Sequence, residues 1–494
     1  MKSLEKSIQT VKKNKFYLLF CLIGLFSALV SVYYTNNAKF PCSGISILIL
    51  VLITLSTLLH KIKTRNLTLY EPLTLAFLGI LIYFIFPSID LIFFGRLIDS
   101  SINLSHYKTL DAQDDYFLAT IISLCALGVF SFYLGYVSTL GKKIGNSLPV
   151  PGHIYSKNSL LKIGICYIVL GIITLLYTIC KVGGPLKWFT TPKGENVFLA
   201  AKSVYVVFLL NILKPAIIIL YIYALLGRSK FIFLLWIGTF IALVIFFTVF
   251  SQGSRRTTLF LALSLIIYHH YAVRPIRLKK IMSVIVILFF FNFSVCITRK
   301  TIPLYNLEST KTHWLKIKDS YEGRRHNLII ITMDFPYCYN SLMQIVDYVP
   351  EKVDYLWGST YAKFFLWPIP RTLWPEKPEG ISRVIVRHFY PDLYDKGLSV
   401  SPTIAGEAYF NFGTLGIVII MALFGVICQS LYTFLKKNRE NIGAVAIYAS
   451  VTPYVFELFR GYFFECTMLY LFYGLCIFIA FYFARRVSRR GLPQ

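Results

Sequence analysis

The sequence predicts an all-α integral membrane protein, folded as one polytopic domain over residues 1–494 with about twelve transmembrane helices. Three observations lead to this fold class. Hydrophobic residues make up 56% of the chain, charged residues make up 15%, and the mean hydropathy is +0.64. The hydrophobic residues form runs of about twenty, the length that crosses the hydrocarbon core of a bilayer. The net charge of +27 is concentrated in the loops of one side, as the positive-inside rule requires, so we do not attribute it to nucleic-acid binding.

The first half of the chain begins with a basic segment, residues 1–15, followed by the first predicted span. No small-residue cleavage site follows, so we predict an uncleaved helix rather than a signal peptide. Pro72 suits the first turn of the third span. Lys214, next to Pro215 in the sixth span, is an intramembrane cation, for which a functional role and snorkelling are both open. The spans of this half are predicted at residues 16–34, 41–59, 72–94, 116–140, 160–180 and 204–226.

The second half contains one large loop, residues 299–402, between the ninth and tenth predicted spans. The loop is rich in Trp, Tyr and Pro and mixed in charge, and we interpret it as a lid over a membrane-level cavity. The tenth span is too long for one perpendicular helix, so its part up to about Gly413 is predicted to lie in the interface or to line a cavity. Both termini are predicted to be cytoplasmic. The spans of this half are predicted at residues 231–250, 257–271, 281–298, 404–434, 442–458 and 462–484.

Several basic residues fall on the side opposite the cytoplasm, against the general bias. Basic side chains held at a membrane face are costly to retain without a partner, and arginine suits diphosphate or carboxylate groups. Pairing with nearby acids such as Glu457, Glu465 or Asp334 is the alternative for any single one. As a set they predict a polyanionic ligand at the outer face. The candidate binding residues are Arg255, Arg256, Arg299, Arg371, Lys377 and Arg460.

Two residues are candidate general bases. His388 lies in the large loop and could accept a proton from a sugar hydroxyl, although a hydrogen-bonded loop histidine is the simpler interpretation. Glu407 follows Thr403 by one helical turn, so it could be the base or form a capping box with Thr403, and the spacing favours the cap. No Cys/His cluster with metal spacing and no glycine-rich phosphate loop occurs, so the sequence predicts neither a metal nor a cofactor.

Four short motifs in the second half resemble those of a known family. They are Gly253-Ser254-Arg255, then Ile369-Pro370-Arg371 with Leu373-Trp374-Pro375 and Lys377-Pro378, then Ser401-Pro402-Thr403, and then Phe412-Gly413. In this order, with a single large outer loop, they resemble the bacterial O-antigen polymerases, the Wzy-type oligosaccharide repeat-unit polymerases. The resemblance is best over residues 231–484, and the first half matches in hydropathy alone.

The resemblance implies a glycosyltransferase of the GT-C type in the bacterial inner membrane, with its active site and large loop in the periplasm. Such enzymes join oligosaccharide repeat units carried on undecaprenyl diphosphate. The resemblance therefore implies lipid-linked oligosaccharides, the lipid bilayer and a chain-length regulator protein as partners. On this basis Arg255 and Arg371 would hold the diphosphate, with Arg256, Arg299 and Arg460 in support. The alternatives are an O-antigen ligase and a flippase or transporter, although a transporter would be expected to show two related halves.

Overall fold

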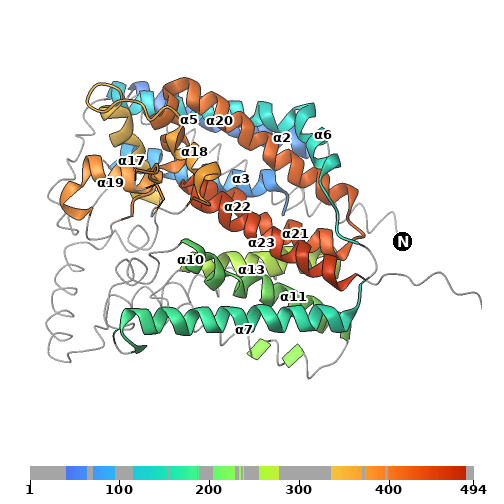
Figure 1. Cartoon of the computed structure of the whole chain (residues 1–494). Helices are drawn as coiled ribbons and strands as arrows, with labels where there is room; N and C mark the ends of the chain where they lie inside the picture. Colours follow the sequence, from blue (N-terminus) through green and yellow to red (C-terminus); the bar gives the residue numbers. More distant parts are fainter. Residues whose placement is uncertain are drawn as a thin grey trace, which may run out of the picture.

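The part of the chain that the computed structural model describes is mostly helical, with turns and short irregular segments between the helices. The described residues are 41–63, 70–94, 115–152, 155–185, 187, 204–227, 233–234, 237–238, 255–276, 335–369, 373–374, 376–394 and 399–485. Within them the β-type pairing is limited to one isolated antiparallel bridge between Tyr155 and Arg485. Figure 1 shows long helices lying side by side, with three shorter helices gathered at one end.

The helices of the first half begin close to the predicted starts. The third predicted span contains a π-helical turn just before Pro87, a residue that cannot donate a regular helical hydrogen bond. Pro72 occupies the first turn of its helix, as predicted. The elements are α2 (Pro41–Lys63), α3 (Pro72–Ile80), η1 (Leu81–Ile85), α4 (Phe86–Phe94), α5 (Asp115–Val137), α6 (Thr139–Ser147), α7 (Lys157–Val182), α10 (Val204–Asn211), α11 (Leu213–Gly227) and α13 (Arg255–Ala272).

The second half contains the longest helix and the three short helices of the large loop. The loop helices are α17 (Phe335–Tyr348), α18 (Ser359–Leu366) and α19 (Ile381–Phe389), followed by a 3-10 turn, η3 (Pro391–Leu393). The chain then enters α20 (Thr403–Lys437), and α21 (Ile442–Val451), α22 (Tyr454–Arg460) and α23 (Phe463–Ala484) complete the described part.

The protein is a helical membrane protein by the length and composition of its helices. Within the described part of the chain, seven helical segments are long and apolar enough to cross a membrane: Pro72–Ile92, Asp115–Val137, Lys157–Val182, Phe208–Leu226, Thr403–Lys437, Ile442–Arg460 and Phe463–Ala484. Two shorter apolar helices, Cys42–Ser56 and Leu259–Ala272, lie in the predicted second and eighth spans. The predicted first, seventh and ninth spans lie wholly or largely outside the described residues, so the total of about twelve stays a prediction.

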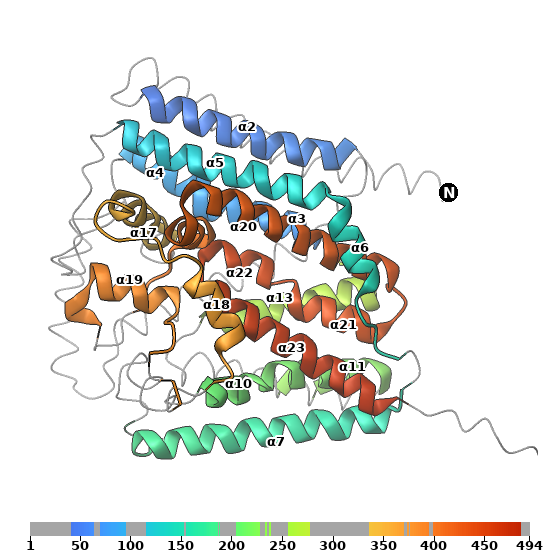
Figure 2. The same cartoon turned by 45° about the horizontal axis from the view of Figure 1, so that its top comes forward.

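The helix ends that the sequence assigns to one side of the membrane also meet in space. At one end, the backbone amides of Cys42 and Ser43 donate to the Asp115 carboxylate at 2.7 and 2.9 Å, which joins the starts of α2 and α5. At the opposite end, Lys437 Nζ donates to the Asn146 carbonyl at 2.8 Å, which joins the end of α20 to α6. Figure 2 shows α17, α18 and α19 at the first of these ends, which we call the loop end.

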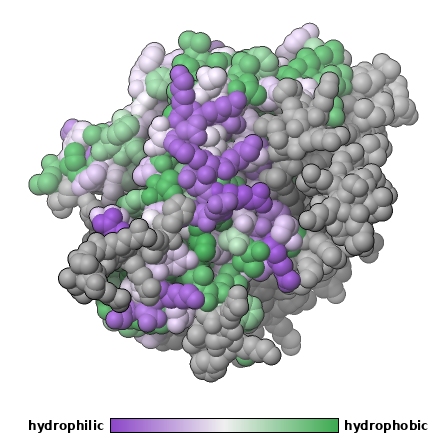
Figure 3. All heavy atoms as spheres, turned by 90° about the vertical axis from the view of Figure 1, so that its right-hand side faces the viewer, coloured by the Kyte–Doolittle hydropathy of each residue, from purple (hydrophilic) through white to green (hydrophobic). Residues whose placement is uncertain are grey.

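The opposite end is basic, and we call it the basic end. Lys142 and Lys143 of α6 and Lys436 and Lys437 of α20 lie there, with exposed side chains. Figure 3 views the molecule from this end and shows a hydrophilic band running from top to bottom across its middle. This concentration of basic residues is the pattern expected of a cytoplasmic face.

The long helix α20 is the central element, and it packs closely against α5. A Cβ atom on Gly135 of α5 would lie 1.9 Å from the Ala422 carbonyl oxygen, and one on Gly425 would lie 2.0 Å from the Phe132 carbonyl oxygen. The two helices therefore touch through their backbones. Such close approach over small residues is a common way for helices to associate in membranes.

A kink divides α20 close to the predicted boundary. Phe412 and Gly413 have non-helical backbone angles, and Gly413 combines φ 62° with ψ −149°, a conformation open essentially to glycine alone. From Gly413 to Phe434 the helix rises about 30 Å, the thickness of the hydrocarbon core. The part of α20 between the kink and Lys436 is therefore long enough by itself to cross the hydrocarbon core.

The interpretation of residues 299–402 as a lid is wrong for α17. Tyr339, Leu342 and Ile345 of this helix are completely buried in the main core. The Tyr339 hydroxyl forms a 2.8 Å hydrogen bond with Ser88 Oγ of α4. Because α17 has a continuous apolar face, it is inserted among α4, α5 and α20 instead of covering them.

Candidate functional site

A cluster of buried polar groups surrounds the start of α20 at the loop end. The helix begins at Thr403, whose backbone has a positive φ of 64° and whose Oγ1 accepts from the Gly406 amide at 3.1 Å. Pro402 and Thr403 pack against Gly461, where a Cβ atom would lie 2.9 Å from the proline ring. The first turn of α20 is thereby joined to the turn between α22 and α23.

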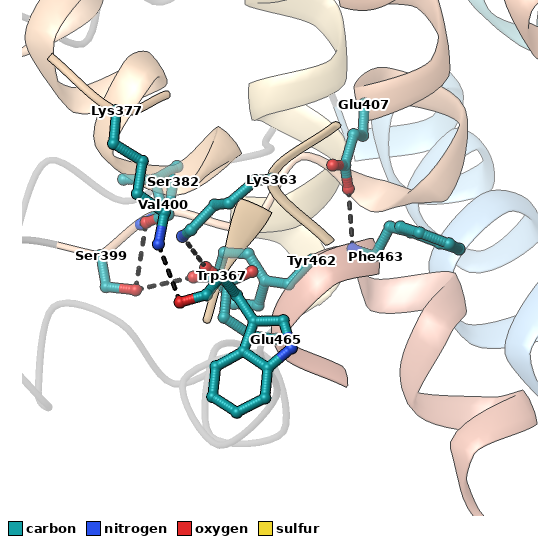
Figure 4. Close-up of polar contacts among 10 residues, drawn as sticks. All are labelled: Lys363, Trp367, Lys377, Ser382, Ser399, Val400, Glu407, Tyr462, Phe463 and Glu465. Atoms are coloured by element: carbon teal, nitrogen blue, oxygen red, sulfur yellow. Dashed lines mark hydrogen bonds and ion pairs between the residues drawn. The ribbon is translucent and has the colours of Figure 1, made fainter. Parts of the chain in front are cut away.

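Glu407 caps a helix, but the helix is α23 and not its own. Its side chain is 1% exposed, and Oε2 accepts from the Phe463 amide at 2.8 Å (Figure 4). Thr403 forms its half of the expected capping box, whereas Glu407 does not return to Thr403, so that prediction is corrected. The reason is that Tyr462, which precedes α23, supplies no side-chain cap and leaves the first amide of α23 without an acceptor. The positive end of the α23 dipole also favours the carboxylate.

The second carboxylate oxygen of Glu407 is buried without a hydrogen bond of regular geometry, and the Thr360 side chain lies near enough to favour the charged carboxylate. Tyr361 Oη, Ser401 Oγ and Asn411 Oδ1, which are buried atoms of residues in or beside this cluster, also lack a hydrogen bond of regular geometry. Asn411 Nδ2 donates to the Glu407 carbonyl and to Thr360 Oγ1, both at 2.8 Å, which ties α18 to α20. Buried polar atoms without partners are rare in folded proteins. Several of them at one place indicate a site that receives polar groups from elsewhere.

Tyr361 of α18 contributes a hydroxyl group to the cluster. Its ring stacks on Phe412 with centroids 6.3 Å apart, and its edge faces Phe463 at 5.1 Å. Burial, with the nearby Glu407 carboxylate in support, raises the pKa of Tyr361 well above its usual value. The phenol therefore stays protonated and can donate a hydrogen bond at neutral pH.

Lys363 of α18 brings a positive charge beside this cluster. Its Nζ lies 3.1 Å from Glu465 Oε1 of α23 (Figure 4), and 4.2 Å from the centre of the Phe464 ring. A Cβ atom on Gly380 would lie 2.6 Å from Lys363 Nζ and 2.5 Å from Glu465 Oε1. The start of α19 therefore rests directly on the ion pair, and the absence of a side chain at position 380 makes this approach possible.

A short hydrogen-bonded chain links α19 to the same turn. The Val400 amide donates to Ser382 Oγ at 2.9 Å, and Ser382 Oγ donates to Ser399 Oγ at 3.2 Å. Ser399 Oγ in turn shares a 2.7 Å hydrogen bond with the Tyr462 hydroxyl (Figure 4). The last part of the large loop is thus held over the turn between α22 and α23.

Arg460, a predicted binding residue, ends α22 beside this cluster. Its guanidinium carbon lies 5.6 Å from the centre of the Tyr462 ring, and the side chain is half-buried. Arg255 and Arg256 form the first turn of α13, and their side chains lie outside the described residues. The Phe260 ring of α13 contacts Phe456 of α22 at 5.9 Å, so the start of α13 lies beside the helix that ends at Arg460.

Lys377 has a different role from the one predicted. It is 8% exposed, and its Nζ donates to the Trp367 carbonyl oxygen at 2.9 Å (Figure 4) and to the Ile369 carbonyl oxygen at 2.9 Å. A buried ammonium group requires acceptors, and these carbonyls supply them. Lys377 therefore ties its own segment to the residues that end and follow α18. Arg371 itself, Arg299 and Asp334 lie outside the described residues.

His388, the other candidate base, lies on α19 with an exposed side chain. Its ring edge faces Phe410 of α20 at 6.5 Å between centroids. Partial burial and the neighbouring Arg387 lower the pKa of His388, so the imidazole is neutral at pH 7. Arg387 also pairs with Glu379 at 2.9 Å.

Lys214 belongs to a separate buried group in the middle of the bundle. It is 8% exposed, so the snorkelling interpretation is wrong. Its Nζ donates to the Tyr473 hydroxyl, which donates to Asn211 Oδ1 at 3.0 Å. The helical path is interrupted between α10 and α11, just before Pro215, which lacks an amide hydrogen. The interruption places Asn211 and Lys214 where both reach Tyr473.

Sequence reasoning missed the residues that surround Glu407. Asn411 could have been found, because it follows Glu407 by four residues on one helix face, next to the Phe412-Gly413 break. Lys363 is 102 residues from Glu465, and although Glu465 was considered as a partner for an outer-face arginine, nothing in the sequence pointed to Lys363. Among the described residues, no three His, Cys, Asp or Glu side chains gather closely enough to hold a metal ion.

The cluster lies within the part of the chain that matches a family model. The model, described as a domain of unknown function (DUF8712), matches residues 337–488, which run from α17 to just beyond the end of α23. No curated protein and no solved structure matches the chain. The family match therefore marks the same elements that build the polar cluster, and it assigns no activity to them.

Proposed function

We propose that the protein is a membrane glycosyltransferase that joins undecaprenyl-diphosphate-linked oligosaccharide repeat units at the periplasmic face of the bacterial inner membrane. In this account it is an O-antigen polymerase of the Wzy type. The observation that carries the proposal is the buried carboxylate of Glu407, with one oxygen held by the Phe463 amide and the other, beside Thr360, making no hydrogen bond of regular geometry. The resemblance of the second half to such polymerases supplies the reaction class.

The level of Glu407 in the membrane suits an amphiphilic substrate. The kink at Phe412 and Gly413 lies one hydrocarbon thickness away from Lys436 and Lys437. Glu407 precedes the kink and therefore lies beyond the hydrocarbon core. A lipid diphosphate has its phosphates and its first sugar at the same level.

The proposed transfer assigns a separate task to each oxygen of Glu407. The acceptor sugar hydroxyl donates its hydrogen bond to Oε1 and then its proton, while Oε2 stays fixed by the Phe463 amide. The hydroxyl oxygen attacks the anomeric carbon of the donor glycan. The bond from that carbon to the diphosphate oxygen breaks, and the diphosphate leaves with the electron pair.

The charge of the leaving diphosphate requires cations at the loop end. Arg460 and Lys363 are the described candidates, and Arg255 and Arg371 are the further candidates from the sequence. Preorganised cations in a site of low polarity stabilise developing negative charge far better than water does. The Tyr361 hydroxyl and Asn411 are placed to orient sugar hydroxyl groups beside Glu407.

The proposal is tested by deleting the gene and complementing it with variants, followed by gel analysis of surface glycans. Glu407→Gln keeps an acceptor for the Phe463 amide and removes the base, so we expect the core with a single repeat unit and normal protein in the membrane. Asp347→Asn, which changes a partly exposed carboxylate of α17 that pairs with Lys352 at 3.8 Å, is the matched control and should give the full ladder. A full ladder from Glu407→Gln would overturn the assignment of the base. A deletion strain with core alone would indicate a ligase or a flippase instead.

A further inference from the structure

The kink of α20 leaves two carbonyl groups without their helical hydrogen bonds, and a segment of the large loop donates hydrogen bonds to them. In a regular helix the carbonyls of Phe410 and Asn411 would accept from amides four residues later. Here the Leu356 amide donates to the Phe410 carbonyl at 3.0 Å, and the Trp357 amide donates to the Asn411 carbonyl at 3.1 Å. The loop backbone therefore replaces the missing helical hydrogen bonds and is fixed to the kink.

Trp357 is held there in an unfavourable backbone conformation with its ring in the open. Its φ is 48°, in the left-handed region that bulky residues rarely adopt. Its side chain is nevertheless 75% exposed. Such strain persists where the surroundings impose it, and here the two hydrogen bonds to α20 do so. Packing in the protein core therefore does not explain why a tryptophan is held in this conformation.

An apolar stripe on α20 begins just after the kink to which the Trp357 backbone is bound. Leu415 is 72% exposed, Ile419 is 55% exposed and Leu423 is 49% exposed, and these residues recur every four positions on one face of the helix. In a membrane-spanning helix such an unpartnered face contacts lipid. Gly358, next to Trp357, lies against Phe412, where a Cβ atom would come within 2.8 Å of the ring. Trp357 is therefore attached at the outer end of the lipid-facing stripe.

We propose that Trp357 anchors the large loop in the headgroup layer of the outer leaflet. The rise of α20 puts the kink about 30 Å from the basic end, at the boundary of the hydrocarbon core. Tryptophan accumulates at that boundary, because its ring is amphipathic. The partner is the lipid bilayer itself. The anchor fixes the depth of the kink, and of the first turns of α20, relative to the bilayer. This effect is independent of the reaction that takes place there.

The anchor is tested by tryptophan fluorescence of the full chain in liposomes. The emission of Trp357 is obtained as the difference between wild type and Trp357→Tyr, which keeps an aromatic ring, and is checked with Trp357→Phe. Trp367→Phe is the matched control, because the Trp367 ring packs against Phe208 of α10 at 5.4 Å. Phospholipids brominated near the top of the acyl chains should quench about half of the Trp357 emission and much less of the Trp367 emission.

Two results would overturn the anchor. Strong quenching of Trp357 by aqueous iodide, without quenching by brominated lipid, would put the ring in water. Quenching by neither agent would mean that a protein surface covers the ring. If one variant fails to insert, the other still yields the difference spectrum, so the comparison remains decisive. None of these outcomes depends on the proposed glycosyl transfer.

Discussion

Replacement of Tyr473 by phenylalanine is expected to destabilise the bundle, because the Tyr473 hydroxyl connects Lys214 of α11 to Asn211 of α10. A neutral hydrogen bond between membrane helices contributes about 0.6 kcal/mol. One that involves a charged group contributes about 1.5–3 kcal/mol. The loss of both predicts a decrease of roughly 2–3.5 kcal/mol in the free energy of unfolding.

The assay is equilibrium unfolding of the purified protein in mixed micelles. Tyr482→Phe is the matched control, since Tyr482 lies on the same helix with a 44% exposed side chain, and it should leave the free energy of unfolding nearly unchanged. The double variant Lys214→Met with Tyr473→Phe should recover part of the loss, because the buried cation that had lost an acceptor is gone. A decrease below about 0.5 kcal/mol for Tyr473→Phe would refute the contribution of this group.

Two further predictions concern the packing of α20 and the role of His388. Gly135→Ala should lower the free energy of unfolding by about 1–3 kcal/mol in the same assay, because the new Cβ atom meets the Ala422 carbonyl oxygen at 1.9 Å. Gly152→Ala is the control, because its nearest contact is at 3.8 Å. Equal stability of the two variants would contradict the close packing of α5 and α20. Arg387→Gln should raise the pKa of His388, because the arginine charge lowers it, so half-maximal modification of His388 by diethyl pyrocarbonate should move to higher pH. The pH profile of polymerisation should not move, and a parallel shift would transfer the role of base from Glu407 to His388.

The parts of the fold that the sequence predicts are local. A proline in the first turn and a glycine at a helix break are signals within a few residues, and they correctly located the start of α3 at Pro72 and the kink of α20 at Gly413. The alternation of basic and acidic loops predicts which helix ends meet, as the contacts of Asp115 with α2 and of Lys437 with α6 confirm.

The parts that the sequence did not predict depend on contacts between distant segments. Glu407 had a local partner in Thr403, and nothing in the pattern indicated that the amide of Phe463 would compete for it. The insertion of α17 into the core depends on the space between helices, which no periodicity describes. Likewise, the ion pair between Lys363 and Glu465 arises from the meeting of α18 and α23, which tertiary packing alone decides.

One measurement tests most directly whether Glu407 is the general base of a polymerase. The purified protein in liposomes is incubated with an oligosaccharide repeat unit on undecaprenyl diphosphate, and the lipid-linked products are analysed by mass spectrometry. Wild type should yield glycans of two or more repeat units, with one undecaprenyl diphosphate released for each bond formed, and Glu407→Gln should leave the single unit unchanged. Equal product lengths from wild type and Glu407→Gln, or no elongation by wild type, would contradict the account.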